Sequence, residues 1–213
     1  AVNQTQLMYR GYEIADLAAN ATFEEVAHLL LVGHKPTSEE LKVFSEEVAS
    51  YRAIPTSVRD AIVDIAKQTP NAHPMSVLRT AVSLLSHTCN LCEDNSAEAE
   101  LLKSKMLLAK IPTCIGTHQR ALDGKDPIEP DASLSHAANL LWCITGEKPH
   151  EISAKVMDVS LILYAEHDFN ASTFTSRVIA STNSDMHSCV CGGIGALKGN
   201  LHGGANEAAM DML

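Results

Sequence analysis

The setting of His202 gives it the potential for chemistry. It lies within Lys198-Gly-Asn-Leu-His-Gly-Gly-Ala-Asn206, at the expected start of a helix. Glycines let a ligand approach the backbone closely, and free N–H groups at a helix start face an anion or a developing oxyanion. That position also favours a neutral imidazole, which can donate a hydrogen bond to a substrate carbonyl. A tight turn without function explains the same glycines, so both interpretations stay open.

His167 is the second candidate, because it joins an apolar segment to a polar one. Residues 159–165 are almost entirely apolar, whereas Asn170 and Ser172 can cap a following helix. One interpretation is a polar corner where imidazole, amide and hydroxyl groups converge on an anionic ligand. The other is a histidine that interacts with the last carbonyls of its own helix, worth roughly 0.3–1 kcal/mol.

Four of the six cysteines form two clusters with histidines, His87-Thr-Cys89-Asn-Leu-Cys92 and His187-Ser-Cys189-Val-Cys191, and the other two are Cys114 and Cys143. A tetrahedral zinc site uses such residues. However, Cys189 and Cys191 are two apart in an apolar helical run, so their side chains point away from each other. We therefore predict no metal site, and reduced thiols that act as small buried hydrophobic groups.

The other histidines are expected to be structural or solvated. His73 precedes Pro74 at a helix start, where it can fix the corner of the chain. The rest are expected on helix surfaces or at helix ends, namely His28, His34, His118, His136 and His150.

Apolar residues recur every three or four positions and strand-like alternation is scarce, which indicates helices along most of the chain. We therefore expect helices to position the candidate residues. Thr22 and Glu25 form a capping box, and Gly33 ends that helix. We predict an all-α chain of about ten helices, in which Pro112 interrupts the fifth, Ser133 caps the sixth and the seventh is largely buried. The predicted ranges are 23–32, 37–48, 55–69, 73–85, 101–119, 134–145, 151–166, 171–180, 185–197 and a last helix after Gly204.

The composition excludes several classes of protein. Hydrophobic residues make up 46% of the 213 residues and the formal net charge is −10. A general nucleic-acid or anionic-membrane binder needs a basic face instead. No uncharged apolar stretch reaches the roughly 18 residues of a spanning helix. We expect a soluble, cytoplasmic protein. The chain begins at Ala1 and stops at Leu213 inside an expected helix, so we also expect a longer parent protein.

The chain resembles the citrate synthase family, and bacterial citrate and 2-methylcitrate synthases in particular. The matching segments occur in order along the whole chain: Tyr9-Arg-Gly-Tyr-Glu-Ile14, Phe23-Glu-Glu-Val26, His73-Pro-Met75, His167-Asp-Phe-Asn-Ala-Ser-Thr-Phe174 and Leu201-His-Gly-Gly-Ala-Asn206. The resemblance implies a multi-helical homodimer that condenses acetyl-CoA or propionyl-CoA with oxaloacetate. It also implies that CoA is released by thioester hydrolysis and that no metal or redox cofactor takes part.

The resemblance also implies roles for individual residues. His202 would hydrogen-bond the thioester carbonyl oxygen while the acyl carbon loses a proton, and Leu201 and Gly203 would lie close to the thioester. His167 would bind oxaloacetate, with Asn170 and Ser172 shaping the corner.

The family pattern continues beyond this chain. The aspartate base, a second histidine and the arginines that bind substrate carboxylates all follow later in the family. Residues 1–202 would then be a large helical domain with an incomplete N-terminus, and 203–213 the start of the small CoA-binding domain. We therefore expect the chain alone to be inactive. The choice of acyl-CoA depends on one methylene, worth about 1–3 kcal/mol, and stays open.

Two alternatives remain. The first is a non-catalytic helical module of the same fold that serves in assembly or ligand binding. The second is a binding protein that uses the two His/Cys clusters for metal or thiol chemistry.

Overall fold

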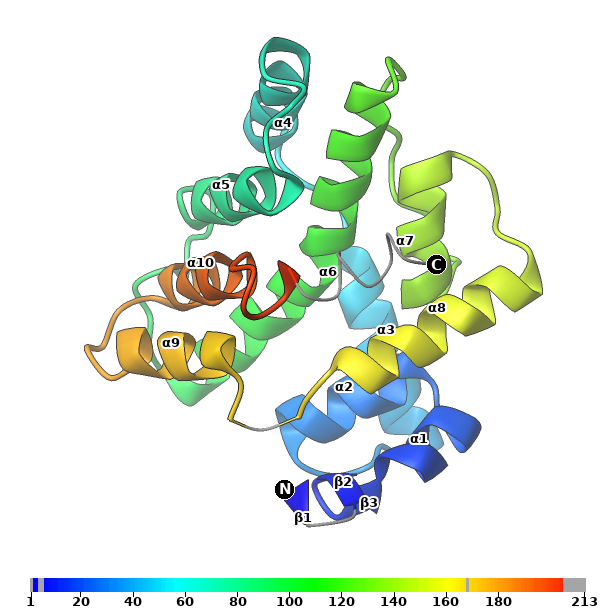
Figure 1. Ribbon diagram of the computed structural model, residues 1–213. Helices are drawn as coiled ribbons and strands as arrows, with labels where there is room; N and C mark the ends of the chain where they lie inside the picture. Colours follow the sequence, from blue (N-terminus) through cyan, green and yellow to red (C-terminus); the bar gives the residue numbers. More distant parts are fainter. Residues whose placement is uncertain (1, 4–5, 168, 205–213) are drawn as a thin grey trace. The chain divides into compact units, whose positions relative to one another are not determined.

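The computed structural model describes residues 2–3, 6–167 and 169–204, and these form ten helices and three short strands (Figure 1). The predicted all-α class is confirmed, because the strands are two to four residues long. Across the described residues, no helix combines the length and apolar character needed to cross a membrane. The elements are β1 (Val2–Asn3), β2 (Gln6–Tyr9), β3 (Tyr12–Glu13), α1 (Ile14–Asn20), α2 (Phe23–Val32), α3 (Ser38–Ser50), α4 (Thr56–Gln68), α5 (Pro74–Ser86), α6 (Ala97–Leu122), α7 (His136–Thr145), α8 (Glu151–Tyr164), α9 (Ala171–Ala180) and α10 (Met186–Leu197).

Two compact units make up the chain, and each combines two stretches of sequence. The first unit contains Ala1–Ile54 and Ser104–Asp168, and the second contains Pro55–Lys103 and Phe169–Leu213. Helix α6 supplies residues to both. The expected boundary between a large and a small domain at residues 202 and 203 stays a prediction. The helix expected after Gly204 lies outside the described residues.

The core of the first unit joins the N-terminal strands to α1, α2 and α8. The strands pair antiparallel in the order β1-β2-β3. Tyr9, Leu17, Val26 and Ile162 are almost completely buried there. The Tyr9 hydroxyl donates a hydrogen bond to the Ile162 carbonyl at 2.9 Å. This bond fixes the last turn of α8, and therefore the backbone that leads to His167.

In the second unit, α10 packs against both α5 and α9 (Figure 1). Val77 and Val82 of α5 and Ile194 of α10 are buried. A side-chain carbon at Gly193 would lie 2.7 Å from the Ser176 hydroxyl of α9, so glycine permits the close approach of the two helices. This packing fixes the start of α9 relative to the end of α10.

Local capping explains most helix starts. Thr22 with Glu25, and Thr37 with Glu40, form reciprocal capping boxes at α2 and α3. His73 accepts a hydrogen bond from the Met75 N–H at 3.2 Å, which confirms its predicted role at the start of α5.

Two helix predictions are wrong, and helix α1 was not predicted at all. Helix α6 continues from Ala97 to Leu122 through Pro112, although proline lacks the N–H of the helical ladder. Ala109 and Cys114 on either side of it are buried, so packing supports the helix there. Helix α7 begins at His136, with Ser135 rather than Ser133 as its cap. Ser133 instead donates its N–H and hydroxyl to the Asp131 carboxylate, at 2.8 and 2.6 Å.

Burial also differs from expectation. In α8 the buried residues are Asp158 and Ile162, whereas Val156 is 61% exposed. The helix is apolar around most of its circumference, so its own unit covers one face of it. Conversely, His28, His118 and His136 are buried rather than at the surface.

Candidate active site

A chain of hydrogen bonds joins His202 to the start of α9. The Nε2 atom of His202 lies 3.0 Å from the Ser172 hydroxyl oxygen. That hydroxyl donates to the Asn170 side-chain oxygen at 2.7 Å. The same oxygen accepts the Thr173 N–H at 2.6 Å, which makes Asn170 the N-cap of α9 as predicted. The structure therefore brings together three of the candidate residues from positions 30 residues apart in the sequence.

These contacts determine the direction of each hydrogen bond. The Thr173 N–H fixes which atom of the Asn170 amide is the oxygen, and that oxygen is purely an acceptor. Ser172 has one hydroxyl proton, and it is used toward Asn170. The Nε2 atom of His202 must then carry a proton and donate to Ser172. In a neutral ring, Nδ1 is consequently the unprotonated nitrogen.

The expectation of free N–H groups beside His202 is wrong. The N–H groups of His202 and Gly204 donate to the Gly199 carbonyl at 2.9 and 3.2 Å, and that of Gly203 donates to the Leu197 carbonyl at 2.9 Å. The chain closes into successive turns after α10, and those turns use the donors internally. A side-chain carbon at Gly203 would collide with the Leu197 carbonyl, so this glycine serves the turn.

The remaining candidate residues are at the surface. The Leu201 side chain is 97% exposed. His167 is also exposed and belongs to the first unit, whereas Asn170, Ser172 and His202 belong to the second. The predicted convergence of His167 with the other three residues stays a prediction.

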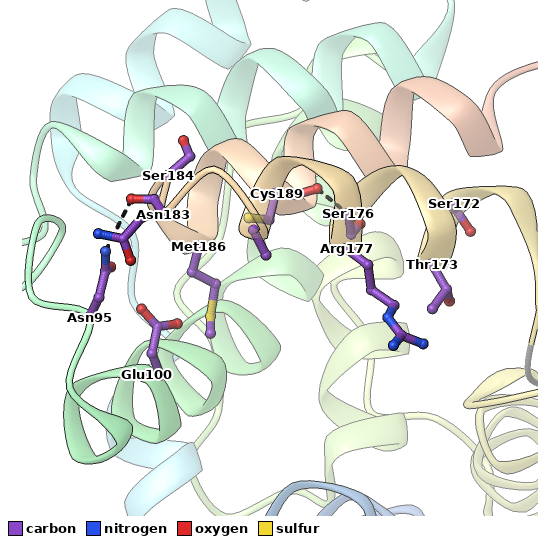
Figure 2. Close-up of a pocket in the computed structure, with 11 residues that line it drawn as sticks. Asn95, Glu100, Ser172, Thr173, Ser176, Arg177, Asn183, Ser184, Met186 and Cys189 are labelled. Carbon is purple, nitrogen blue, oxygen red and sulfur yellow. Dashed lines mark hydrogen bonds between the residues drawn. The ribbon is translucent and has the colours of Figure 1, made fainter.

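A pocket of about 550 Å³ lies beside Ser172 within the second unit (Figure 2). Its lining includes the Arg177 side chain on α9 and the Glu100 side chain on α6. Neither residue was predicted to belong to a site. The only sequence feature that points to either is that Arg177 is the single cationic residue of α9. Ser172 therefore contacts His202 and also belongs to the lining of this pocket.

The two His/Cys clusters of the sequence meet through one residue of each. Cys114, Cys143 and Cys189 are buried free thiols, as predicted for small hydrophobic groups. Burial raises the pKa of the Cys114 thiol to about 12. The two residues that meet are Cys92 and His187.

Comparison with known proteins identifies the family of this fold. The family model described as "Citrate synthase, C-terminal domain" matches residues 1–213. The chain belongs to the citrate synthase family. A citrate synthase of Haloferax volcanii is 44% identical over 211 residues, which are 98% of this chain and 55% of that protein. A 2-methylcitrate synthase of Shewanella oneidensis is 45% identical over 213 residues, which are 100% of this chain and 55% of that protein.

Solved structures give the same relationship. Citrate synthase from Thermoplasma acidophilum, solved as a ternary complex with carboxymethyl coenzyme A and oxaloacetate, matches with a TM-score of 0.91 and 30% identity, over 98% of this chain and 54% of that one. Citrate synthase from Pyrobaculum aerophilum matches with a TM-score of 0.90 and 37% identity, over 97% of this chain and 53% of that one. The chain thus spans about half the length of the relatives that it matches.

Proposed function

We propose that this chain contributes to the condensation of acetyl-CoA or propionyl-CoA with oxaloacetate, which gives citrate or 2-methylcitrate. In this proposal His202 binds the thioester carbonyl oxygen while the acyl carbon loses a proton. That proton is weakly acidic until the growing charge on the oxygen is stabilised, so a donor placed there lowers the barrier. His167, Asn170 and Ser172 serve oxaloacetate binding, and Leu201 and Gly203 lie by the thioester.

The observation that carries this proposal is the hydrogen bond between His202 and Ser172. With Ser172 donating to Asn170, Nε2 of His202 holds the proton. If Ser172 instead turns its proton to Nε2, the proton of a neutral ring moves to Nδ1, which can then donate to a carbonyl. We infer that this exchange prepares His202 for the thioester. It needs neither a metal nor a redox cofactor.

The catalytic set is completed, in this proposal, by groups that this chain does not contain. The family's aspartate base, its second histidine and its carboxylate-binding arginines follow the segment that resembles Leu201–Asn206. We therefore propose that the 213-residue chain is inactive alone and that the product of the complete reading frame carries the activity.

A homodimer is also part of this proposal. Helix α8 exposes Ile152, Val156 and Leu163, at 68%, 61% and 46%. Positions four and seven residues apart lie on one face of a helix, so these side chains offer a continuous apolar surface. A second copy of the chain is the occupant that we propose for this surface.

Product formation tests the proposal directly. Citrate and 2-methylcitrate are measured by mass spectrometry after incubation of oxaloacetate with each acyl-CoA, which avoids interference from the protein's own thiols. We expect product from the complete reading frame and none from the chain alone. His202→Ala should lower kcat by about 10²–10³-fold, as the loss of one oxyanion donor does elsewhere. Absence of both products from the complete protein would favour the non-catalytic module.

The acyl substrate follows from the same measurement. The citrate synthase and the 2-methylcitrate synthase relatives have nearly the same sequence identity to this chain, 44% and 45%. The ratio of kcat/KM for acetyl-CoA and propionyl-CoA therefore assigns the chain to one activity or the other.

A further inference from the structure

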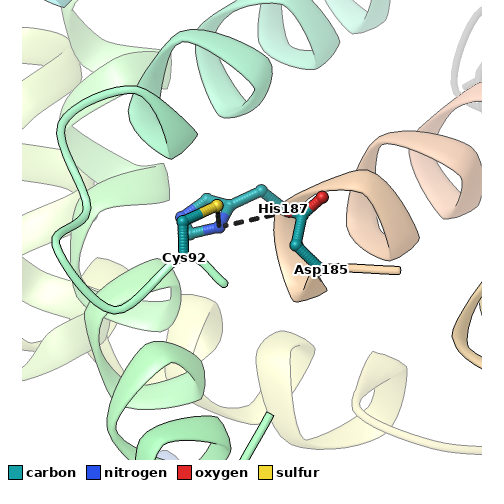
Figure 3. Close-up of side chains that lie close together, drawn as sticks. All are labelled: Cys92, Asp185 and His187. Atoms are coloured by element: carbon teal, nitrogen blue, oxygen red, sulfur yellow. Dashed lines mark hydrogen bonds and ion pairs between the residues drawn. The ribbon is translucent and has the colours of Figure 1, made fainter. Parts of the chain in front are cut away.

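Three potential metal ligands converge beside the start of α10 (Figure 3). Cys92 comes from the connection between α5 and α6, Asp185 is the N-cap of α10, and His187 lies in its first turn. The His187 Nδ1 atom is 3.9 Å from the Cys92 sulfur and 3.7 Å from the nearer Asp185 carboxylate oxygen. All three ligand atoms lie within 4.8 Å of one another.

We propose that Cys92, Asp185 and His187 bind one Zn²⁺ ion, which joins the α5–α6 connection to the start of α10. This reverses our expectation from the sequence that the thiols hold no metal. Each sequence cluster is a poor site by itself. The fold instead selects one residue from each cluster and adds a carboxylate that belongs to neither.

The spacing of the ligand atoms fits zinc after a small contraction. Zinc bonds of about 2.3 Å to sulfur and about 2.0 Å to nitrogen place these two atoms roughly 3.6 Å apart in a tetrahedron. The observed separation is 3.9 Å. Nitrogen and carboxylate oxygen would be roughly 3.4 Å apart around zinc, against 3.7 Å observed. Side-chain adjustments of a few tenths of an ångström therefore complete the three-ligand face.

The ligand chemistry also favours zinc. Thiolate and imidazole suit Zn²⁺, whereas Mg²⁺ and Ca²⁺ prefer oxygen ligands. One thiolate, one carboxylate and one neutral imidazole together balance the two positive charges, so a partly buried site carries no net charge. Without metal, burial and the Asp185 carboxylate raise the pKa of Cys92 to about 11. Zinc binding would replace that thiol proton, which passes to solvent.

The surroundings hold the ligands in place. Ser188 donates its N–H to Asp185 at 3.0 Å, and the His187 side chain is 5% exposed. Lys103 is completely buried and donates to the carbonyls of Cys92 and Asp94, at 3.2 and 2.7 Å. Its charge is matched by Glu100, 2.7 Å away, so the ammonium group holds the Cys92 backbone without adding a net charge.

A nucleophilic Cys–His–Asp triad is a poorer explanation of the same residues. In such a triad, one ring nitrogen faces the nucleophile and the other faces the carboxylate. Here Nδ1 is the atom near both Cys92 and Asp185. The His187 Nδ1 atom, the Cys92 sulfur and the Asp185 oxygen are therefore arranged as three ligands of one metal ion would be. Three protein ligands then leave a fourth position for water, beside the partly exposed Cys92.

Titration of the reduced, metal-free chain with Co²⁺ tests the proposal, because cobalt substitutes for zinc and is visible by absorption. We expect one equivalent per chain, with a thiolate-to-cobalt charge-transfer band that stoichiometric Zn²⁺ removes. Cys92→Ser should abolish the band. Asp185→Asn keeps an oxygen that can cap the helix but removes the carboxylate ligand. Loss of a group that only hydrogen-bonds a metal ligand weakens binding roughly 10–100-fold, so loss of the ligand itself should weaken cobalt binding at least as much.

Cys191→Ser is the matched control, since Cys191 is a partly buried thiol outside the cluster, and it should leave binding unchanged. Helicity of every variant is checked by circular dichroism, and Asp185→Asn decides the matter if Cys92→Ser does not fold. The proposal is overturned if the chain binds no cobalt, if Asp185→Asn binds it as tightly, or if the control loses the band as Cys92→Ser does.

Discussion

One hydroxyl proton on Ser172 controls which nitrogen of His202 can donate. Ser172 lies between the imidazole and the Asn170 amide, and its proton is directed to Asn170 because the Thr173 N–H fixes that amide. The arrangement gives His202 a defined ring orientation and tautomer before any ligand arrives. In this tautomer Nδ1 carries no proton, so the proposed exchange at Ser172 must come before Nδ1 donates to the thioester carbonyl.

The tautomer is directly measurable. In the neutral ring of His202 we expect a protonated Nε2 and an unprotonated Nδ1, by ¹⁵N NMR at alkaline pH with the signals assigned through His202→Gln. Ser172→Ala should remove this preference, because Nε2 loses its acceptor. Ser176→Ala, on the same helix but bonded to the Cys189 carbonyl, should leave the signals unchanged. A protonated Nδ1 in the parent chain would contradict the assignment.

A buried histidine in the first unit makes stability depend on pH. Burial, together with the nearby Arg52 charge, lowers the pKa of His136 to about 4. The unfolded chain has a histidine pKa of about 6.5. Between these values the unfolded state binds a proton that the folded state does not, so stability falls as pH decreases from about 6.5 to 4. The full effect is about 3 kcal/mol at most, at 1.4 kcal/mol per pKa unit.

Comparison with His136→Gln isolates this contribution. We expect urea unfolding of the variant to lose less stability between pH 7 and pH 4 than the parent chain does. Equal losses in the parent and in His136→Gln would show that His136 does not carry the effect.

At the scale of elements, glycines set how closely helices approach. A side-chain carbon at Gly116 of α6 would overlap the Cys143 backbone of α7. At Gly195 of α10 the nearest atom would be 3.7 Å away, on Arg79, which is ordinary contact. Two helical glycines therefore differ in whether they are required for packing.

Alanine substitution separates the two cases. Gly116→Ala should destabilise the chain by about 1–3 kcal/mol, because the backbone of α7 must move. Gly195→Ala should stabilise it by roughly 0.5–1 kcal/mol, because alanine is the better helix former and has space. Thermal and urea unfolding check both changes. A Gly116→Ala variant as stable as the parent chain would refute the close α6–α7 contact.

At the scale of the whole molecule, the exposed apolar side chains of α8 form the interface that we propose for a homodimer. Val156→Glu places a charge in the middle of this surface, so it should convert a dimer to monomers in sedimentation equilibrium. Val43→Glu, a control at a 55% exposed valine of α3, should leave the dimer intact. A parent chain that is monomeric throughout, or a Val156→Glu variant that stays dimeric, would count against this interface.

The sequence by itself determined the features that depend on neighbouring residues. The side chains of Thr22 and Asn170 cap their helices by accepting a hydrogen bond from the N–H three residues later in the sequence. The starts of α2 and α9 could therefore be predicted. Patterns of this range also located every described helix except α1, and they located the segments of family resemblance. The start of α7 was missed because two serines compete there, and Asp131 engages Ser133.

Only the tertiary structure decided which distant side chains meet and which helix faces are covered. Helical periodicity predicts which residues share one face of a helix. Which other segment covers that face depends on how the helices of the unit pack together. Hence His136 is buried, Val156 is exposed and His202 meets Ser172. Cys92 and His187 are 95 residues apart, and no spacing within either cluster reveals their contact.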